Sequence, residues 1–136
     1  MAREFGEGLT QNTDKCDLLI VDDEPSFRLF LEDYFKQRIP GIKIKLAEDG
    51  EEAYNLALKF RARIIWTCIK MPRKSGLDLI ESVKKIPDIQ NTKIIVYTAY
   101  HSGKDKALAL GADAFLPKGD YDQLEDGLKI VGNFLK

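Results

Sequence analysis

A cysteine and a pair of carboxylates stand where apolar runs of this sequence end. Cys68 closes a run that starts at Ile64, and a turn containing proline and glycine follows it. Asp22 and Asp23 directly follow another aliphatic run, and two acids in that place more often form a site than a solvated turn. A thiol that has lost its proton is a nucleophile. Whether Cys68 can act as a nucleophile therefore depends on the groups that the fold places around it.

The elements that must position these residues alternate along the chain. Short apolar runs indicate strands at 17–21, 42–46, 63–68, 93–98 and 114–116, and helical spacing indicates helices at 25–39, 49–60, 75–86, 102–110 and 120–135. Asp49 and Ser75 each begin a helix with the spacing of a capping box. Alternation without a β-hairpin signal predicts a single-domain α/β fold of the flavodoxin-like, doubly wound kind with a parallel sheet.

The expected strand order, 2-1-3-4-5, sets which residues meet. It creates a topological switch point between the first and third strands, where open α/β sheets place their chemistry. Asp22 and Asp23 should lie on one side of that point and Cys68 on the other. Thr98 ends the fourth strand and should reach the same edge.

Composition limits the function classes. The chain has 136 residues, 44% of them apolar, which fits one globular domain, and its net charge of −1 offers no basic footprint for nucleic acid. No stretch is long and apolar enough to span a bilayer and no secretory signal is evident, so we expect a cytoplasmic protein with two free thiols. We expect a disordered leader at 1–15 and the folded domain at 16–136.

Short motifs at the strand ends occur in a specific order. They are Asp22-Asp23-Glu24-Pro25, Asp49-Gly50, Lys70-Met71-Pro72 with Ser75-Gly76-Leu77, Thr98-Ala99, and Pro117-Lys118. Each is weak alone, but in this order they resemble the CheY-like receiver domains of two-component response regulators, over nearly everything from 17 to 136. The resemblance implies a module of phosphorelay signal transduction and not an enzyme.

The resemblance also implies roles for the residues at this edge. Asp22 and Asp23 would hold a Mg²⁺ together with the backbone carbonyl of Lys70, which suits the preference of Mg²⁺ for oxygen ligands. Thr98 would donate a hydrogen bond to the phosphoryl group, and Lys118 would pair with it.

Partners follow from the same resemblance. Thr98 and the aromatic Phe115 would form the switch that reports activation. The face formed by the fourth helix, fifth strand and fifth helix would receive a downstream effector. A histidine kinase or a phosphotransfer protein would be the upstream partner, and no nucleic acid or membrane is implied.

Cys68 is the main departure from the family pattern, because this position is that of the phospho-acceptor aspartate. Lys118 would lower the pKa of the thiol, whereas burial and the two carboxylates would raise it. Sulfur is also a poor ligand for Mg²⁺, so we expect weak Mg²⁺ binding and the loss of ordinary phosphorylation. Gly119 after Lys118 and Ala62-Arg63 before the central strand are smaller departures, which touch only local geometry.

Different explanations of Cys68 stay open. The protein is either a receiver that signals without phosphorylation or an ordinary receiver in which cysteine has replaced the aspartate. A hypothesis from a different class of function is a thiol-based redox sensor or a cysteine-dependent enzyme on the same fold. In it, His101 could pair with Cys68. In the simplest reading the thiol is an inert, buried apolar residue.

Overall fold

The computed structural model describes residues 15–119 and 121–136. The elements are β1 (Leu18–Val21), α2 (Pro25–Arg38), β2 (Ile44–Ala47), α3 (Gly50–Phe60), β3 (Ile64–Thr67), α4 (Gly76–Lys84), β4 (Lys93–Thr98), the 3₁₀ turn η1 (His101–Gly103), α5 (Lys104–Leu110), β5 (Ala114–Pro117) and α6 (Tyr121–Phe134). The predicted leader, 1–15, falls almost wholly outside the described residues, as does the start expected for the last helix at Asp120.

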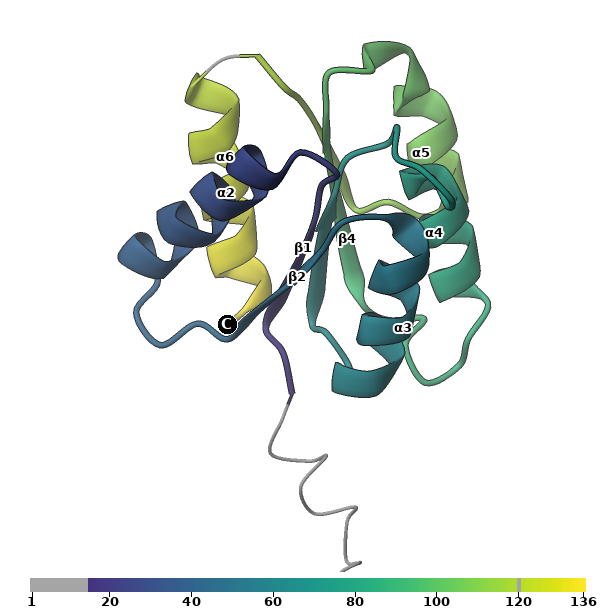
Figure 1. Cartoon of the computed structure of the whole chain (residues 1–136), viewed down its shortest axis with the longest axis horizontal. Coiled ribbons are helices and arrows are strands. Elements are labelled where there is room, and N and C mark those ends of the chain that lie inside the picture. The colour runs from purple at the N-terminus through teal and green to yellow at the C-terminus, as the bar shows by residue number, and fades with distance from the viewer. Residues whose placement is uncertain (1–14, 120) are drawn as a thin grey trace, which may run out of the picture.

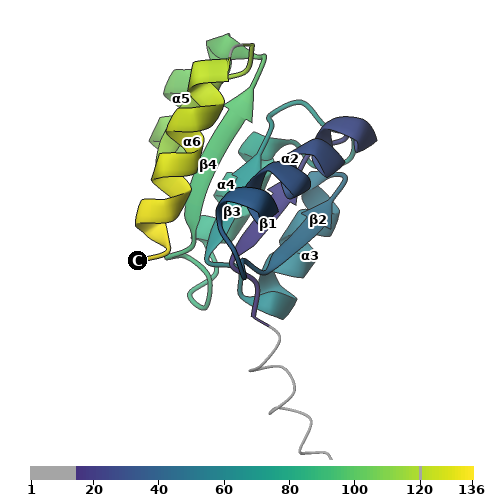
Figure 2. The ribbon, with the colours of Figure 1, turned by 90° about the vertical axis from the view of Figure 1, so that its left-hand side faces the viewer.

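The five strands form one parallel sheet in the order β2-β1-β3-β4-β5, which confirms the predicted topology. Helices cover both faces, with α2 and α6 on one side and α3, α4 and α5 on the other (Figures 1 and 2). Within the described ranges, no helix combines the length and apolar character that crossing a membrane requires.

The alternation of side chains along the strands builds a core on each face. The central strands β1 and β3 are buried throughout, as expected of strands covered by helices on both sides. The edge strand β2 keeps Lys45 exposed between two half-buried residues, which agrees with its predicted edge position. The carboxyl ends of β1, β3 and β4 therefore lie together at one rigid edge.

Most element ends differ from the prediction by one or two residues, and two of these differences are informative. β3 ends at Thr67, so Cys68 is the first residue of the following loop and not the last of the strand. α4 ends at Lys84 and not at Ile86, because a residue before proline disfavours the helical region and Pro87 follows.

The predicted capping box is complete at α4, whereas at α3 only one of its two hydrogen bonds forms. At α4, Ser75 accepts from the N–H of Asp78, and Asp78 accepts from the N–H of Ser75. At α3, Asp49 accepts from the N–H of Glu52, but the Glu52 carboxylate accepts from the N–H of Glu48 instead.

A close approach of α6 to β3 fixes the core on one face. Trp66 is 1% exposed and packs edge-on against Phe35 with ring centroids 5.0 Å apart. Gly127 of α6 lies against the indole, and a β-carbon there would collide with the six-membered ring. The glycine is therefore required by packing, although it weakens the helix intrinsically.

We expect Gly127→Ala to destabilise the protein by about 1–3 kcal/mol, the usual cost of overpacking a core. Gly132→Ala is the matched control, since nothing lies within 4 Å of a β-carbon built there. In the same helix this change should stabilise by about 0.5–1 kcal/mol, because alanine is the better helix former. Urea unfolding of both variants measures the difference, and stabilisation by both would contradict the packing argument.

Candidate functional site

The residues predicted to share an edge do lie together there. One ligand atom each from Asp22, Asp23 and Cys68 lies within 4.8 Å of the others. The loop after β1 carries the two carboxylates, and the loop after β3 carries the thiol. The N–H of Cys68 donates to the carbonyl of Val21 at 3.2 Å, which ties the two loops at their origin.

Asp22 is the anchor of this edge. Its side chain is buried, and its Oδ2 accepts from Nζ of Lys118 at 3.0 Å. Its Oδ1 accepts from the N–H of Glu24 at 2.9 Å, and Arg28 donates to its backbone carbonyl at 2.6 Å. A buried carboxylate needs such partners, because an unpaired charge in this environment is costly.

Lys118 reaches this carboxylate from the end of β5. Its N–H donates to the carbonyl of Thr98 at 2.7 Å, which fixes its backbone beside β4. Its ammonium lies 4.4 Å from the ring centroid of Phe27 and 5.7 Å from that of Tyr97. Ion pair and aromatic faces together hold the charge at the centre of the edge.

Thr98 lies at the same edge but is engaged locally. It is buried, and its hydroxyl accepts from the N–H of Tyr100 at 3.0 Å. Phe115 is not part of the cluster. It is half-buried on β5 and packs against the apolar core on the face covered by α3, α4 and α5.

The Cys68 thiol is buried, at 6% exposure, and points toward the carbonyl of Lys70 at 3.8 Å. Burial and then the charge of Asp22 raise the pKa of the thiol to about 12, and the ammonium of Lys118 opposes them only in part. The direction agrees with the prediction from sequence. At neutral pH the sulfur is therefore a protonated, weakly nucleophilic group.

His101 does not complete a catalytic pair in this geometry. It is exposed, and its Nε2 lies 3.4 Å from the backbone carbonyl of Lys118. In the part of the chain that the structure describes, no hydrogen bond joins His101 to Cys68. The dyad considered from sequence is therefore not formed.

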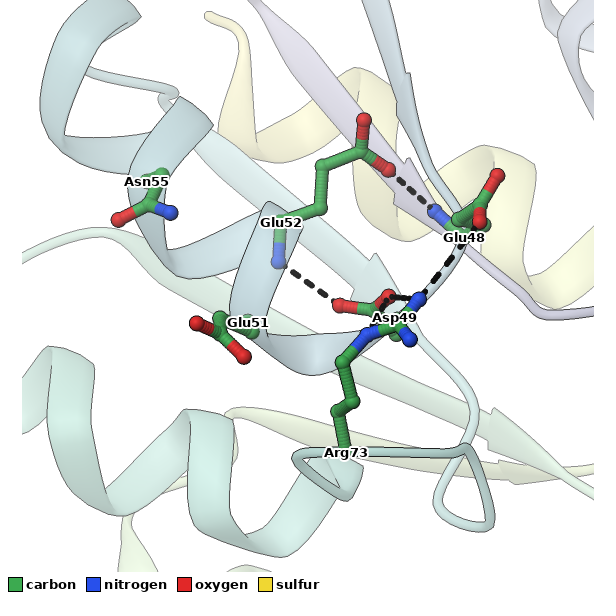
Figure 3. A pocket seen from close by; sticks show the side chains of 6 residues that line it. All are labelled: Glu48, Asp49, Glu51, Glu52, Asn55 and Arg73. Atoms are coloured by element: carbon green, nitrogen blue, oxygen red, sulfur yellow. Dashed lines mark hydrogen bonds and ion pairs between the residues drawn. The ribbon is translucent and has the colours of Figure 1, made fainter.

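Sequence reasoning missed the part played by Arg73. Its Nε and one terminal nitrogen donate to Oδ2 of Asp49 at 2.8 and 2.6 Å, which ties the loop after Cys68 to the start of α3 (Figure 3). The N–H of Gly50 also donates to the carbonyl of Lys74 at 2.9 Å. The basic turn was visible in the sequence, but nothing in it indicated a partner 24 residues away.

This contact borders an open hollow of about 450 Å³, lined by Glu48, Asp49, Glu51, Glu52, Asn55 and Arg73 (Figure 3). The one buried acid in it, Asp49, is already used by the helix cap and by Arg73. We infer that Asp49 and Arg73 hold the loop, and we assign no ligand to the hollow.

Comparison with known proteins bears on this arrangement. A family model described as the response regulator receiver domain matches residues 18–129. The gliding motility regulatory protein of Myxococcus xanthus is 33% identical over 105 residues, covering 76% of this chain and 13% of that protein. The regulator of RpoS of Escherichia coli K12 is 34% identical over 113 residues, covering 80% of this chain and 32% of that protein. The chain thus spans a third or less of these relatives.

A solved structure with a similar fold is also a response regulator. The response regulator protein TrrA of Thermotoga maritima, in complex with Mg²⁺-BeF, superposes with a TM-score of 0.72 at 31% identity. The match covers 85% of this chain and 98% of that one.

We expect Asp49→Ala to lower the free energy of unfolding by about 0.5–2 kcal/mol, because it removes the cap of α3. Asp49→Asn keeps a capping side chain but loses the charge that Arg73 pairs with. The asparagine variant should therefore lie between wild type and the alanine variant in a urea titration at pH 7. Equal stability of wild type and Asp49→Ala would contradict this account of the loop.

At low pH the difference in the free energy of unfolding between wild type and Asp49→Asn should disappear. The N–H of Glu52, opposed by burial and helped by Arg73, lowers the pKa of Asp49 below its ordinary value. A carboxyl with a lowered pKa stabilises the fold above its unfolded pKa of about 4, and that contribution disappears as the pH falls through the folded value. Unfolding titrations at steps from pH 7 to pH 2.5 should show the two curves converging below about pH 4.

Cys68 should react slowly with alkylating agents. With a pKa of about 12, its thiolate fraction at pH 8 is on the order of a thousandfold below that of free cysteine. A Cys16→Ala background assigns the signal to Cys68, and the same chain in urea supplies the free-thiol control. The rate should keep rising with pH beyond pH 10. A plateau near neutral pH would instead favour the thiol enzyme or redox sensor.

Proposed function

This chain belongs to the response regulator receiver domain family, and we propose that it is a member in which Cys68 occupies the position of the phospho-accepting aspartate. The chain is a receiver domain of two-component signalling. We propose that residues 16–136 form this domain, that it acts in the cytoplasm, and that ordinary aspartyl phosphorylation is lost. Receiver domains are regulatory modules and not enzymes in the ordinary sense.

The observation that carries this proposal is the place of Cys68. It follows the central strand directly and lies with Asp22 and Asp23 in one cluster. Lys118 enters the same edge from β5 and reaches Asp22. These neighbours support the assignment of Cys68 to the acceptor position.

Mg²⁺ fits these residues poorly. Receiver domains bind this ion at the acceptor site, and here Asp22, Asp23 and the carbonyl of Lys70 would hold it and supply charge neutralisation for a phosphoryl group. The third side chain of the set is a sulfur, which Mg²⁺ disfavours. The best carboxylate, Asp22, is already paired with Lys118 at 3.0 Å. We therefore propose weak Mg²⁺ binding and derive no step through the ion.

The chemistry of the thiol supports the loss of phosphorylation. An aspartate attacks phosphorus as a carboxylate, which is ionised at every physiological pH. The buried thiol keeps its proton, because its pKa is raised to about 12. Thr98 and Lys118 would still stabilise a phosphoryl group, but the nucleophile is missing.

Regulation would then depend on binding and not on phosphoryl transfer. We propose that a histidine kinase or a phosphotransfer protein remains the upstream partner. The effector would bind the face formed by α5, β5 and α6, which are the fourth helix, fifth strand and fifth helix of the sheet-and-helix series. Thr98 and Phe115 lie on two neighbouring strands of that region, β4 and β5, which supports their role as the switch.

The alternative, a thiol-based sensor or enzyme, lacks the features that it needs. A reactive cysteine requires a lowered pKa and a neighbouring base. Cys68 has a raised pKa, and His101 contacts the carbonyl of Lys118 instead.

Cys68→Asp should create a phosphate-accepting receiver. The variant supplies the carboxylate nucleophile and a third carboxylate ligand for Mg²⁺. Without metal it should be less stable than wild type, because two close carboxylates repel by on the order of 4 kcal/mol at an effective dielectric of 20. Incubation with Mg²⁺ and acetyl phosphate should give a phosphoryl adduct by intact mass, which hydroxylamine removes.

Cys68→Asn is the matched control, because it has the shape of aspartate without the charge. It should stay unmodified, as should wild type. An unmodified Cys68→Asp variant that is folded and binds Mg²⁺ would show that the pocket is incomplete. A phosphorylated wild type would show that cysteine does not disable it.

A further inference from the structure

We propose that Asp22, Asp23 and Cys68 form a binding site for a thiophilic divalent cation, such as Zn²⁺ or Cd²⁺, in preference to Mg²⁺. The inference concerns the edge described above and rests on the proposed placement of Cys68 beside the two carboxylates. It goes further, because it assigns a metal ligand role to the thiol at a position that is proposed no longer to accept a phosphoryl group.

The geometry of the donors suits one small ion. Their ligand atoms lie within 4.8 Å of one another. Zinc bonds of about 2.3 Å to sulfur and about 2.0–2.2 Å to oxygen place neighbouring ligand atoms roughly 3.5 Å apart. A shift of about one ångström therefore closes the set. Asp23 is exposed and free to make this shift without disturbing the core.

The burial of the donors gives the site both rigidity and access. Asp22 and Cys68 are 3% and 6% exposed and are held by strand ends, so their positions are set before an ion arrives. Asp23 faces solvent and provides the way in. The carbonyl of Lys70, 3.8 Å from the sulfur, or a water molecule can supply the fourth ligand of a tetrahedral site.

The sulfur decides which ion the site prefers. Thiolate ligands favour Zn²⁺ and its soft relatives, whereas Mg²⁺ requires oxygen ligands. When the sulfur–metal bond forms, the sulfur–hydrogen bond breaks and the proton passes to solvent. No electron is transferred, and no further reactant is needed.

Lys118 is the competitor for this site. Its ammonium must leave Oδ2 of Asp22, 3.0 Å away, when an ion binds that carboxylate. It already lies 4.4 Å from the ring centroid of Phe27, which offers a resting place near its present position. Cation binding therefore competes with the Asp22–Lys118 ion pair.

Titration of the full chain with Cd²⁺, followed by thiolate-to-metal charge-transfer absorption, and with Zn²⁺, followed by calorimetry, tests the proposal. Wild type and Cys16→Ala should each bind one ion. Cys68→Ser should lose the absorption band and bind Zn²⁺ about 10- to 100-fold more weakly, while its Mg²⁺ affinity should not fall. Asp23→Asn should also weaken Zn²⁺ binding. Because Asp23 is exposed, this variant should stay folded and can be compared directly with wild type.

The competition gives a second, independent measurement. Lys118→Met should tighten the Zn²⁺ affinity of the folded protein, because no ion pair has to be broken. Lys70→Met removes the same charge from the same edge but leaves the Asp22 pair and the backbone carbonyl in place, so it should change the affinity much less. Its ammonium lies over Tyr100, 4.3 Å from the ring centroid.

Each result decides between distinct conclusions. Equal Zn²⁺ affinity in wild type and Cys68→Ser, or a charge-transfer band that disappears in Cys16→Ala, would overturn the proposed cation site and leave the proposed function standing. Tighter binding of Mg²⁺ than of Zn²⁺ by wild type would also overturn the cation site, whereas the proposed function is overturned only by phosphorylation of wild type.

Discussion

The arrangement depends on the buried charge of Asp22. A carboxylate at 3% exposure needs partners, because burying an unpaired charge is costly. Lys118 provides the counter-charge from a position 96 residues later in the chain, at 3.0 Å. This ion pair connects the end of β1 to the end of β5 across the two strands between them. The loops at this edge are therefore arranged around one electrostatic requirement.

Cys68 changes the balance of charge around that pair. An aspartate in its place would add a second buried carboxylate beside Asp22, and one ammonium could not neutralise both. The neutral thiol removes this repulsion, so Asp22 and Lys118 satisfy one another without a metal. With the neutral thiol the pair can therefore close without an ion, and an incoming cation has to compete with it. Burial and then the charge of Asp22 raise the pKa of the same thiol.

Much of this fold could be predicted from periodicity and turn chemistry, because each is a local property. Apolar runs and helical spacing predicted the strands and helices, and the strand order expected of a doubly wound sheet then predicted the edge at which Asp22, Asp23 and Cys68 meet. Contacts between distant segments could not be predicted in this way. The pairing of Arg73 with Asp49, of Lys118 with Asp22 and of Gly127 with Trp66 depends on the relative placement of two elements. Periodicity tells which face a residue is on, but not which side chain it meets there.

The presence of a complete set of acidic and basic residues is consequently weak evidence for phosphorylation. If Lys118 were lost, Asp22 would be left as a buried carboxylate without its ammonium, and removing one partner of a buried pair is strongly destabilising. Arg28 and the N–H of Glu24 further commit Asp22 to the fold. Stability alone thus accounts for Asp22 and Lys118, whether or not a phosphoryl group ever binds. In the proposed assignment, the residue that distinguishes a phosphorylated receiver from this one is the residue at the acceptor position, where this chain carries Cys68.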